Sequence, residues 1–160
     1  MTEDAATTLR SVLLGSWTVA TVDELGTARA RLEETLCART PIACAETEPT
    51  RSLLQNIVLV ASELTANALE HAGGPARLDV VHDDVSLMVS VMDRVPDSPP
   101  VLSRDRELGE GGFGLQLTLR IADEVGWYRT PDGAKHVWAR FVVAGDGPRP
   151  TRADPSPATM

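Results

Sequence analysis

The chain has 160 residues, of which 42% are hydrophobic and 24% charged, as is ordinary for a single soluble globular domain. Its net charge of −8 argues against nonspecific binding to nucleic acids or anionic membranes. No apolar run approaches the ~20 residues that cross a bilayer, and the acidic start Met1-Thr2-Glu3-Asp4 is unlike a secretory signal. We therefore expect a cytoplasmic protein that contacts neither nucleic acid nor membrane directly.

The chain divides into a short N-terminus, 1–10, one domain, 11–143, and a tail, 144–160. We expect the N-terminus to be flexible. The tail is rich in Pro, Asp, Ser, Thr and Arg, a composition that buries too little apolar surface to fold, and we expect it to be disordered. The first element of the domain is expected at 11–20, where apolar and β-branched residues favour a strand at the edge of a sheet.

Two helices are predicted next. Segment 22–39 has Leu and Ala at helical spacing, and Asp23 is placed to serve as its N-cap. The longer segment, 51–72, is amphipathic, with Thr50 as its expected cap and Gly73-Gly74-Pro75 as its end. The expected packing face of this long helix consists of Leu54, Ile57, Ala61, Leu64, Ala68 and Ala72.

A β-hairpin is predicted at 76–82 and 85–92, joined by Asp83-Asp84. Alternation along its second strand separates the apolar residues onto two faces, with Leu87, Val89 and Val91 on one face and Met88 and Met92 on the other. Segment 94–110 follows, with several charges, three prolines and no periodicity. A structureless segment of this length inside a domain is usually functional, such as a lid over a binding site, or else disordered.

The last elements are a helix over 111–124 and a second hairpin. Its strands are expected at 125–129 and 136–143, around the strong turn signal Pro131-Asp132-Gly133. Together these elements predict an α+β fold, with about five strands packed on three helices in two layers.

The long helix carries a polar stripe opposite its packing face. At ~100° per residue, Glu63, Asn67 and Glu70 share one stripe, with His71 at its shoulder. A carboxylate, a carboxamide and an imidazole on one rigid rod suit a hydrated divalent cation and the polarisation of a water or hydroxyl. Most such stripes are simply the solvated face of a helix, and that reading remains open for this helix taken alone.

A glycine cluster about forty residues further on adds a second signal. Gly109, Gly111, Gly112 and Gly114 let backbone N–H groups approach phosphates closely, and the following helix N-terminus favours anions. A dinucleotide fingerprint would need a strand directly before Gly109, whereas a Walker A loop is excluded because no Lys-Ser/Thr follows. The remaining alternative is a merely flexible loop. The stripe and the glycines together indicate a nucleotide site.

Asp93 ends the second strand of the first hairpin, directly before the expected lid. A carboxylate held there can accept a hydrogen bond from an exocyclic amine and so select adenine over guanine. Its alternative role is that of an ordinary strand-terminating aspartate.

These motifs resemble those of the GHKL superfamily of gyrase, chaperone and histidine-kinase ATPases. Segment 63–72 resembles its N-box, 91–93 the start of its adenine-binding G1 box, and 109–117 its G2 box after the ATP lid. The closing strand, 135–141, is similar to that of small stand-alone actinobacterial members, which resemble anti-sigma-factor serine/threonine kinases. Order and spacing match over about 11–143.

The resemblance implies a role for each matching residue. Glu63 would be the general base, Asn67 would coordinate Mg²⁺ bridging the ATP phosphates, and His71 would lie near those phosphates. Asp93 would bind the adenine amine. The residues expected to hold the phosphates through the backbone of the G2 box are Gly109, Gly111, Gly112, Gly114 and Leu115.

The resemblance also implies a Bergerat-type ATP-binding fold: a two-layer α/β sandwich whose mixed, mostly antiparallel sheet is covered by helices on one face. The implied function is an ATP-binding regulator that transfers the γ-phosphate to Ser or Thr of an antagonist protein. Its partners would be a sigma factor, the antagonist or both, with a homodimer left open. The family usually has glycine two residues after the adenine-binding Asp, and this chain has Val95. The alternative is therefore a nucleotide-dependent switch without phosphotransfer.

Overall fold

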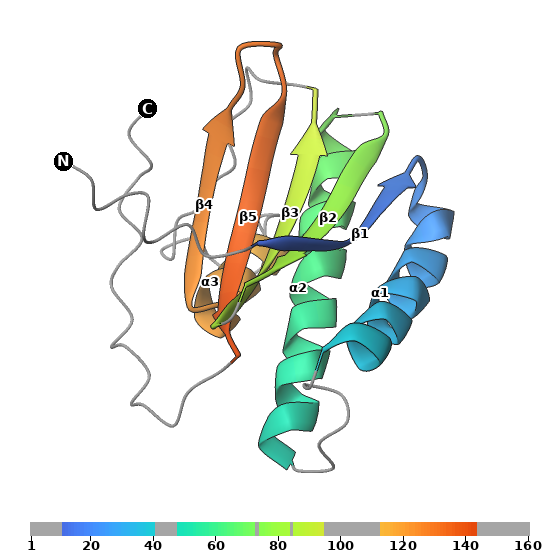
Figure 1. The fold of residues 1–160 in the computed structure, drawn as a ribbon. Coiled ribbons are helices and arrows are strands. Elements are labelled where there is room, and N and C mark those ends of the chain that lie inside the picture. The colour runs from blue at the N-terminus through green and yellow to red at the C-terminus, as the bar shows by residue number, and fades with distance from the viewer. Residues whose placement is uncertain (1–10, 41–47, 73, 84, 95–112, 144–160) are drawn as a thin grey trace, which may run out of the picture.

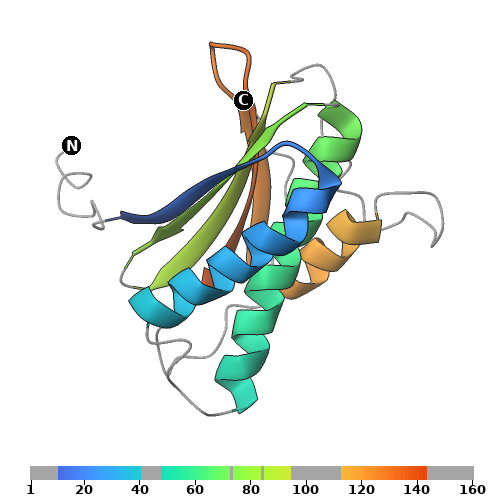
Figure 2. The same cartoon turned by 90° about the vertical axis from the view of Figure 1, so that its right-hand side faces the viewer.

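The computed structural model describes residues 11–40, 48–72, 74–83, 85–94 and 113–143. Within them, five strands form one sheet and helices pack against one of its faces (Figures 1 and 2). In chain order the elements are β1 (Val12–Val19), the 3₁₀ turn η2 (Val22–Glu24), α1 (Leu25–Arg39), α2 (Glu48–Ala72), β2 (Ala76–His82), β3 (Ser86–Asp93), α3 (Phe113–Ile121), β4 (Glu124–Arg129) and β5 (Lys135–Val142). The predicted N-terminal segment, tail and most of the lid lie outside the described residues.

The strand order is β1-β2-β3-β5-β4, and each of the four pairings is antiparallel. β3 and β4 therefore run parallel to each other with β5 between them, and α3 lies on the connection that joins them. The predicted α+β fold is confirmed, with β1 at one edge as expected. The resemblance implies a mixed, mostly antiparallel sheet, and here the parallel relation occurs only between strands that are not neighbours.

The helix layer has α2 at its centre, flanked by α1 on one side and α3 on the other (Figure 2). The predicted packing face of α2 is confirmed, because its central residues are buried: Ile57, Ala61, Leu64 and Ala68. They pack over the equally buried inner positions of the central strands: Val80, Leu87, Val89, Val91, Ala139 and Phe141. The alternation expected in β3 holds too, since Met88 and Met92 are half-buried on the opposite face, which no described helix covers.

Two predicted helix caps are wrong. Asp23 lies inside the 3₁₀ turn that leads into α1, and Glu24 occupies the N-cap position of that helix. The Glu24 carboxylate accepts a hydrogen bond from the backbone N–H of Ala20 instead, which ties this turn to the end of β1. Thr50 is a residue of α2 itself, because that helix begins at Glu48.

The helix before the last hairpin is shorter than predicted. α3 ends at Ile121 rather than Glu124, which already belongs to β4. The reason is Asp123: its N–H donates to the carbonyl of Arg140, and its carboxylate accepts from the N–H of Val142. These bonds attach Asp123 to the sheet one residue before the predicted helix end, so the helix stops three residues early.

The predicted turn between the last two strands is confirmed. Gly133 has a φ of 88°, a conformation that glycine adopts without steric cost, and its N–H donates to the carbonyl of Thr130. Among the described residues, no helix is both long and apolar enough to cross a membrane.

Candidate functional site

One end of the sheet gathers the segments that the sequence marks as functional. Here α2 ends at Ala72, β3 ends at Asp93, β5 begins at Lys135 and β4 ends at Arg129 (upper end in Figure 1). Antiparallel pairing brings these strand ends together: the register pairs Asp93 with Lys135, and Lys135 with Arg129. Asp93, the residue predicted to bind adenine, therefore lies in a row with two other charged residues, Lys135 and Arg129.

Asp93 is 1% exposed. It follows the inward positions Leu87, Val89 and Val91 at the strand period of two, so its carboxylate lies on the helix-covered face of the sheet. A buried carboxylate at a strand end is an acceptor that water does not saturate. This placement suits the recognition of a donor group on a ligand.

Lys135 lies beside Asp93 on the neighbouring strand, with its Nζ 3.3 Å from Oδ2 of Asp93. The side chains of Lys135 and Asp93 are only 6% and 2% exposed. The sequence reasoning did not single out Lys135, although a signal was present. Lys135 is in phase with the buried Val137, Ala139 and Phe141, so a charged residue falls where the alternation predicts an inward side chain.

The polar stripe of α2 is divided by the fold. Glu63 and Asn67 are half-buried, whereas Glu70 and His71 are exposed. The two residues to which the resemblance assigns chemistry therefore lie between the buried and the exposed faces of α2. Thr65, between them in sequence, is buried, and its hydroxyl donates to the carbonyl of Ala61 at 2.7 Å.

The glycine cluster is described only in part. Gly114 and Leu115 belong to the first turn of α3, whereas Gly109, Gly111 and Gly112 lie outside the described residues. Two polar residues of α3 that the sequence reasoning passed over, Gln116 and Thr118, are buried. The buried surface of α3 therefore includes polar side chains, those of Gln116 and Thr118, as well as leucines.

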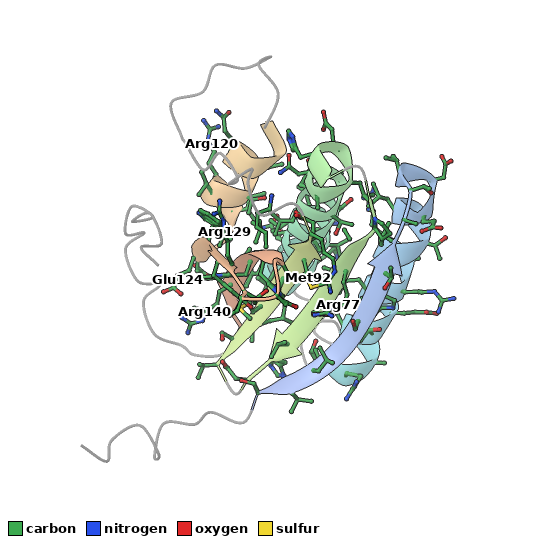
Figure 3. All side chains as sticks on the ribbon, turned by 90° about the horizontal axis from the view of Figure 1, so that it is seen from above. Arg77, Met92, Arg120, Glu124, Arg129 and Arg140 are labelled. Carbon is green, nitrogen blue, oxygen red and sulfur yellow. The ribbon has the colours of Figure 1, made fainter. Side chains whose placement is uncertain are left out.

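The opposite face of the same sheet end carries a separate surface. A hollow of about 430 Å³ there is lined by Thr18, Gly74, Pro75, Ala76, Arg77, Met92 and Arg94. Figure 3 shows Arg77 and Met92 on neighbouring strands at this end, and Arg77 pairs with Asp79 at 3.0 Å. Burial, and then the nearby Arg77, hold the pKa of His136 below its ordinary value. Asp93 faces away from this hollow.

The comparisons with known proteins agree with this architecture. The model of the histidine kinase-like ATPase domain matches residues 18–141, which is most of the chain. The chain belongs to the histidine kinase-like ATPase family. A solved structure described as the SiaB–SiaC complex from Pseudomonas aeruginosa contains a similar chain, at 17% identity and a TM-score of 0.52. The alignment covers 88% of this chain and 95% of that chain, and it supports the fold. A comparison with curated proteins gives no significant match.

Membership of this ATPase family implies a nucleotide site, usually with Mg²⁺, and the residues present fit both. Asp93 is a buried carboxylate that would accept a hydrogen bond from a base, and Asn67 has a half-buried carboxamide oxygen that would suit the ion. Mg²⁺ prefers oxygen ligands and is commonly held by one or two protein groups, several waters and the substrate phosphates. Such a site needs no cluster of protein carboxylates, and the described part of the chain has no group of three or more His, Cys, Asp or Glu placed so that they could hold a metal ion.

Proposed function

We propose that this protein is an ATP-binding regulator that transfers the γ-phosphate of ATP to Ser or Thr of an antagonist protein. The observation that carries the proposal is the buried Asp93 at the end of β3, on the helix-covered face of a histidine kinase-like ATPase domain. An adenine base has an exocyclic amine, which donates a hydrogen bond to this carboxylate.

The stripe on α2 supplies the rest of the proposed chemistry. Asn67 would hold Mg²⁺ through its side-chain oxygen, and the ion would supply positive charge to neutralise the ATP phosphates. Glu63 accepts the proton of the attacking hydroxyl, in the role of the general base. Both side chains are half-buried, which supports the proposal because each is partly packed and partly exposed.

The partner class follows from two likenesses. The motifs resemble those of anti-sigma-factor serine/threonine kinases, and the similar solved chain comes from a complex of two proteins, SiaB and SiaC. We therefore propose a protein substrate of the antagonist kind, with a sigma factor as the second binding partner.

Phosphotransfer is tested with γ-labelled ATP, Mg²⁺ and a lysate of the source organism. The purified protein should transfer label to Ser or Thr of a lysate protein, and Glu63→Ala should abolish transfer while sparing ATP binding, since the base acts only in the reaction. Glu70→Ala is the matched control, because Glu70 is exposed on the same helix stripe. Full transfer activity in Glu63→Ala would reduce the stripe to a solvated face.

A second candidate function is a nucleotide-dependent switch that binds its partners without phosphotransfer. The sequence Asp93-Arg94-Val95-Pro96 favours it, because a β-branched residue and a proline stand where the family usually has glycine, and they restrict the backbone beside the base. Calorimetry with Mg-ATP, combined with the label-transfer assay, distinguishes the two functions: ATP binding without label transfer supports the switch, whereas transfer supports the kinase.

A further inference from the structure

The Asp93–Lys135 pair is unusual in its burial. Removing two charges from water costs several kcal/mol per ion, so a buried pair contributes little net stability compared with apolar residues of similar size. The side chains of Asp93 and Lys135 are nevertheless 2% and 6% exposed, at the ends of two central strands. The pairing of β3 with β5 also fixes the position of Asp93 relative to Lys135, because the two residues are partners in the register.

We propose that Lys135 is a specificity-determining residue of the base pocket: its ammonium donates a hydrogen bond to ring nitrogen N1 of adenine, beside the amine bound by Asp93. This inference rests on the proposed ATP binding and extends it to a second residue. Lys135 also positions Asp93, because the ion pair holds the carboxylate at the strand end. The two side chains together offer one acceptor and one donor, 3.3 Å apart.

The order of acceptor and donor selects the base. Adenine presents an N–H donor at its 6-amine and an acceptor at the adjacent N1, which complements the carboxylate of Asp93 and the ammonium of Lys135. Guanine presents the reverse pattern, an acceptor at O6 and a donor at N1. Because both side chains start from neighbouring strand ends, they cannot exchange places to accommodate it.

The test uses two ATP analogues that each lack one of these groups. The first has carbon in place of ring nitrogen N1 but keeps the exocyclic amine. The second, purine riboside triphosphate, keeps N1 but lacks the amine. The wild-type protein should bind ATP at least about tenfold more tightly than either analogue, as the loss of one charge-assisted hydrogen bond predicts.

Variants then assign each preference to its residue. Lys135→Met keeps the apolar stem and should bind ATP and the N1-deficient analogue equally, while still discriminating against the analogue without the amine. Lys135→Arg retains the donor and should restore preference for N1. Arg140→Met is the matched control: Arg140 also lies on β5 and pairs with Glu124 at 3.0 Å, but on the uncovered face at the far end of the strand (Figure 3). It should behave like the wild type.

The outcomes separate this inference from the function on which it rests. Wild-type protein that binds ATP and the N1-deficient analogue equally overturns the role of Lys135, while ATP binding stands. An equal loss of affinity for ATP and both analogues in Lys135→Met also overturns it, since a purely structural ion pair would act on all ligands alike. If the wild type binds no ATP, both the inference and the proposed function fail. The wild-type comparison is decisive even if Lys135→Met does not fold.

Discussion

Asp93 has two demands placed on it, because the same carboxylate neutralises Lys135 and is proposed to bind adenine. A carboxylate has two oxygens and about four lone-pair sites, so it can accept from several donors at once. The pair at 3.3 Å therefore leaves base recognition possible in chemical terms. Substitutions of Asp93 will affect both ligand affinity and folding, and the two effects must be measured separately.

Asp93→Asn should weaken ATP binding by about 10- to 100-fold, since one charge-assisted hydrogen bond contributes about 1.5–3 kcal/mol. The wild type should bind ATP more tightly than GTP, because the carboxylate only accepts. Isothermal titration of both proteins with Mg-ATP and Mg-GTP checks the prediction. Equal affinities of the wild type for the two nucleotides would remove Asp93 from the base pocket.

Breaking the ion pair from one side should be costly for folding. Lys135→Met leaves Asp93 as a buried carboxylate without its cation and should lower the free energy of unfolding by about 3–5 kcal/mol. Adding Asp93→Leu should recover most of that loss, because two apolar side chains satisfy each other. Urea unfolding of the single and double variants measures both effects. A single variant as stable as the wild type would show that the pair is not buried in solution.

The pair also marks how far sequence reasoning reaches for single residues. Asp93 was predicted as a site residue because it ends an alternating strand before a loop. Lys135 was in phase with three buried apolar residues, yet only the strand register reveals that the two charges are neighbours. Register between distant strands depends on the whole sheet, and no local pattern in the sequence encodes it.

At the scale of elements, the β2–β3 turn is stabilised by one carboxylate. Asp83 accepts hydrogen bonds from the N–H groups of Val85 and Ser86, at 2.8 and 2.7 Å, and from the Ser86 hydroxyl. Burial raises the pKa of Asp83, but these hydrogen bonds and the nearby Arg140 outweigh it and hold the pKa below 3.8. The ionised form is therefore the one that stabilises the turn.

This shift has a defined consequence for pH. Because the folded pKa of Asp83 is lowered, its contribution is fully present above about pH 4 and is lost as pH falls through the folded value. Asp83→Asn should cost about 1 kcal/mol or less at pH 7, since the site is close to solvent, and the difference from wild type should vanish in strong acid. Urea unfolding at a series of pH values checks it. A constant difference across that series would contradict the assignment.

In the last hairpin, the indole ring of Trp138 packs against Gly126, where a larger residue would clash with it. A Cβ atom added at Gly126 would lie 2.5 Å from Cζ2 of Trp138, its partner on β5. Gly126→Ala should destabilise the fold by about 1–3 kcal/mol and change the tryptophan fluorescence, because the ring must move. Gly26→Ala is the control: nothing lies within 4 Å of a Cβ there, and alanine favours helix α1. Equal stability of the two variants would contradict the close contact.

The elements themselves were largely predictable, and the failures have physical causes. Alternating strands and the long amphipathic helix carry signals over many residues, so their positions were recovered. Helix ends depend on a few hydrogen bonds: Asp23 lost its capping role to a 3₁₀ turn, and Asp123 drew the chain into the sheet before the predicted helix end. The parts of the candidate site that fall in 95–112 remain predictions, since these residues lie outside the described part of the chain.

At the scale of the whole molecule, ligand binding and folding are linked. A ligand that binds only the folded state stabilises it by RT ln(1 + [L]/Kd), which is about 2.7 kcal/mol at one hundred times the Kd. Mg-ATP should therefore raise the melting temperature of the wild type, and the shift should grow with ATP concentration. Asn67→Ala should reduce the dependence of this shift on Mg²⁺. A melting temperature unchanged by saturating Mg-ATP would contradict the proposed nucleotide site.

The antiparallel register also decides where the domain can be joined to other molecules. Val12 at the start of β1 and Phe141 near the end of β5 lie in one row across the sheet, through His82 and Leu87. This row is at the opposite end of the sheet from Asp93, about 20 Å away along the strands. Val12 and Phe141 are three strand spacings, roughly 14 Å, apart. A short linker could close the chain into a circle there without crossing the nucleotide site. A tether attached at Val12 or Phe141 would leave from the end of the sheet opposite the proposed base pocket at Asp93.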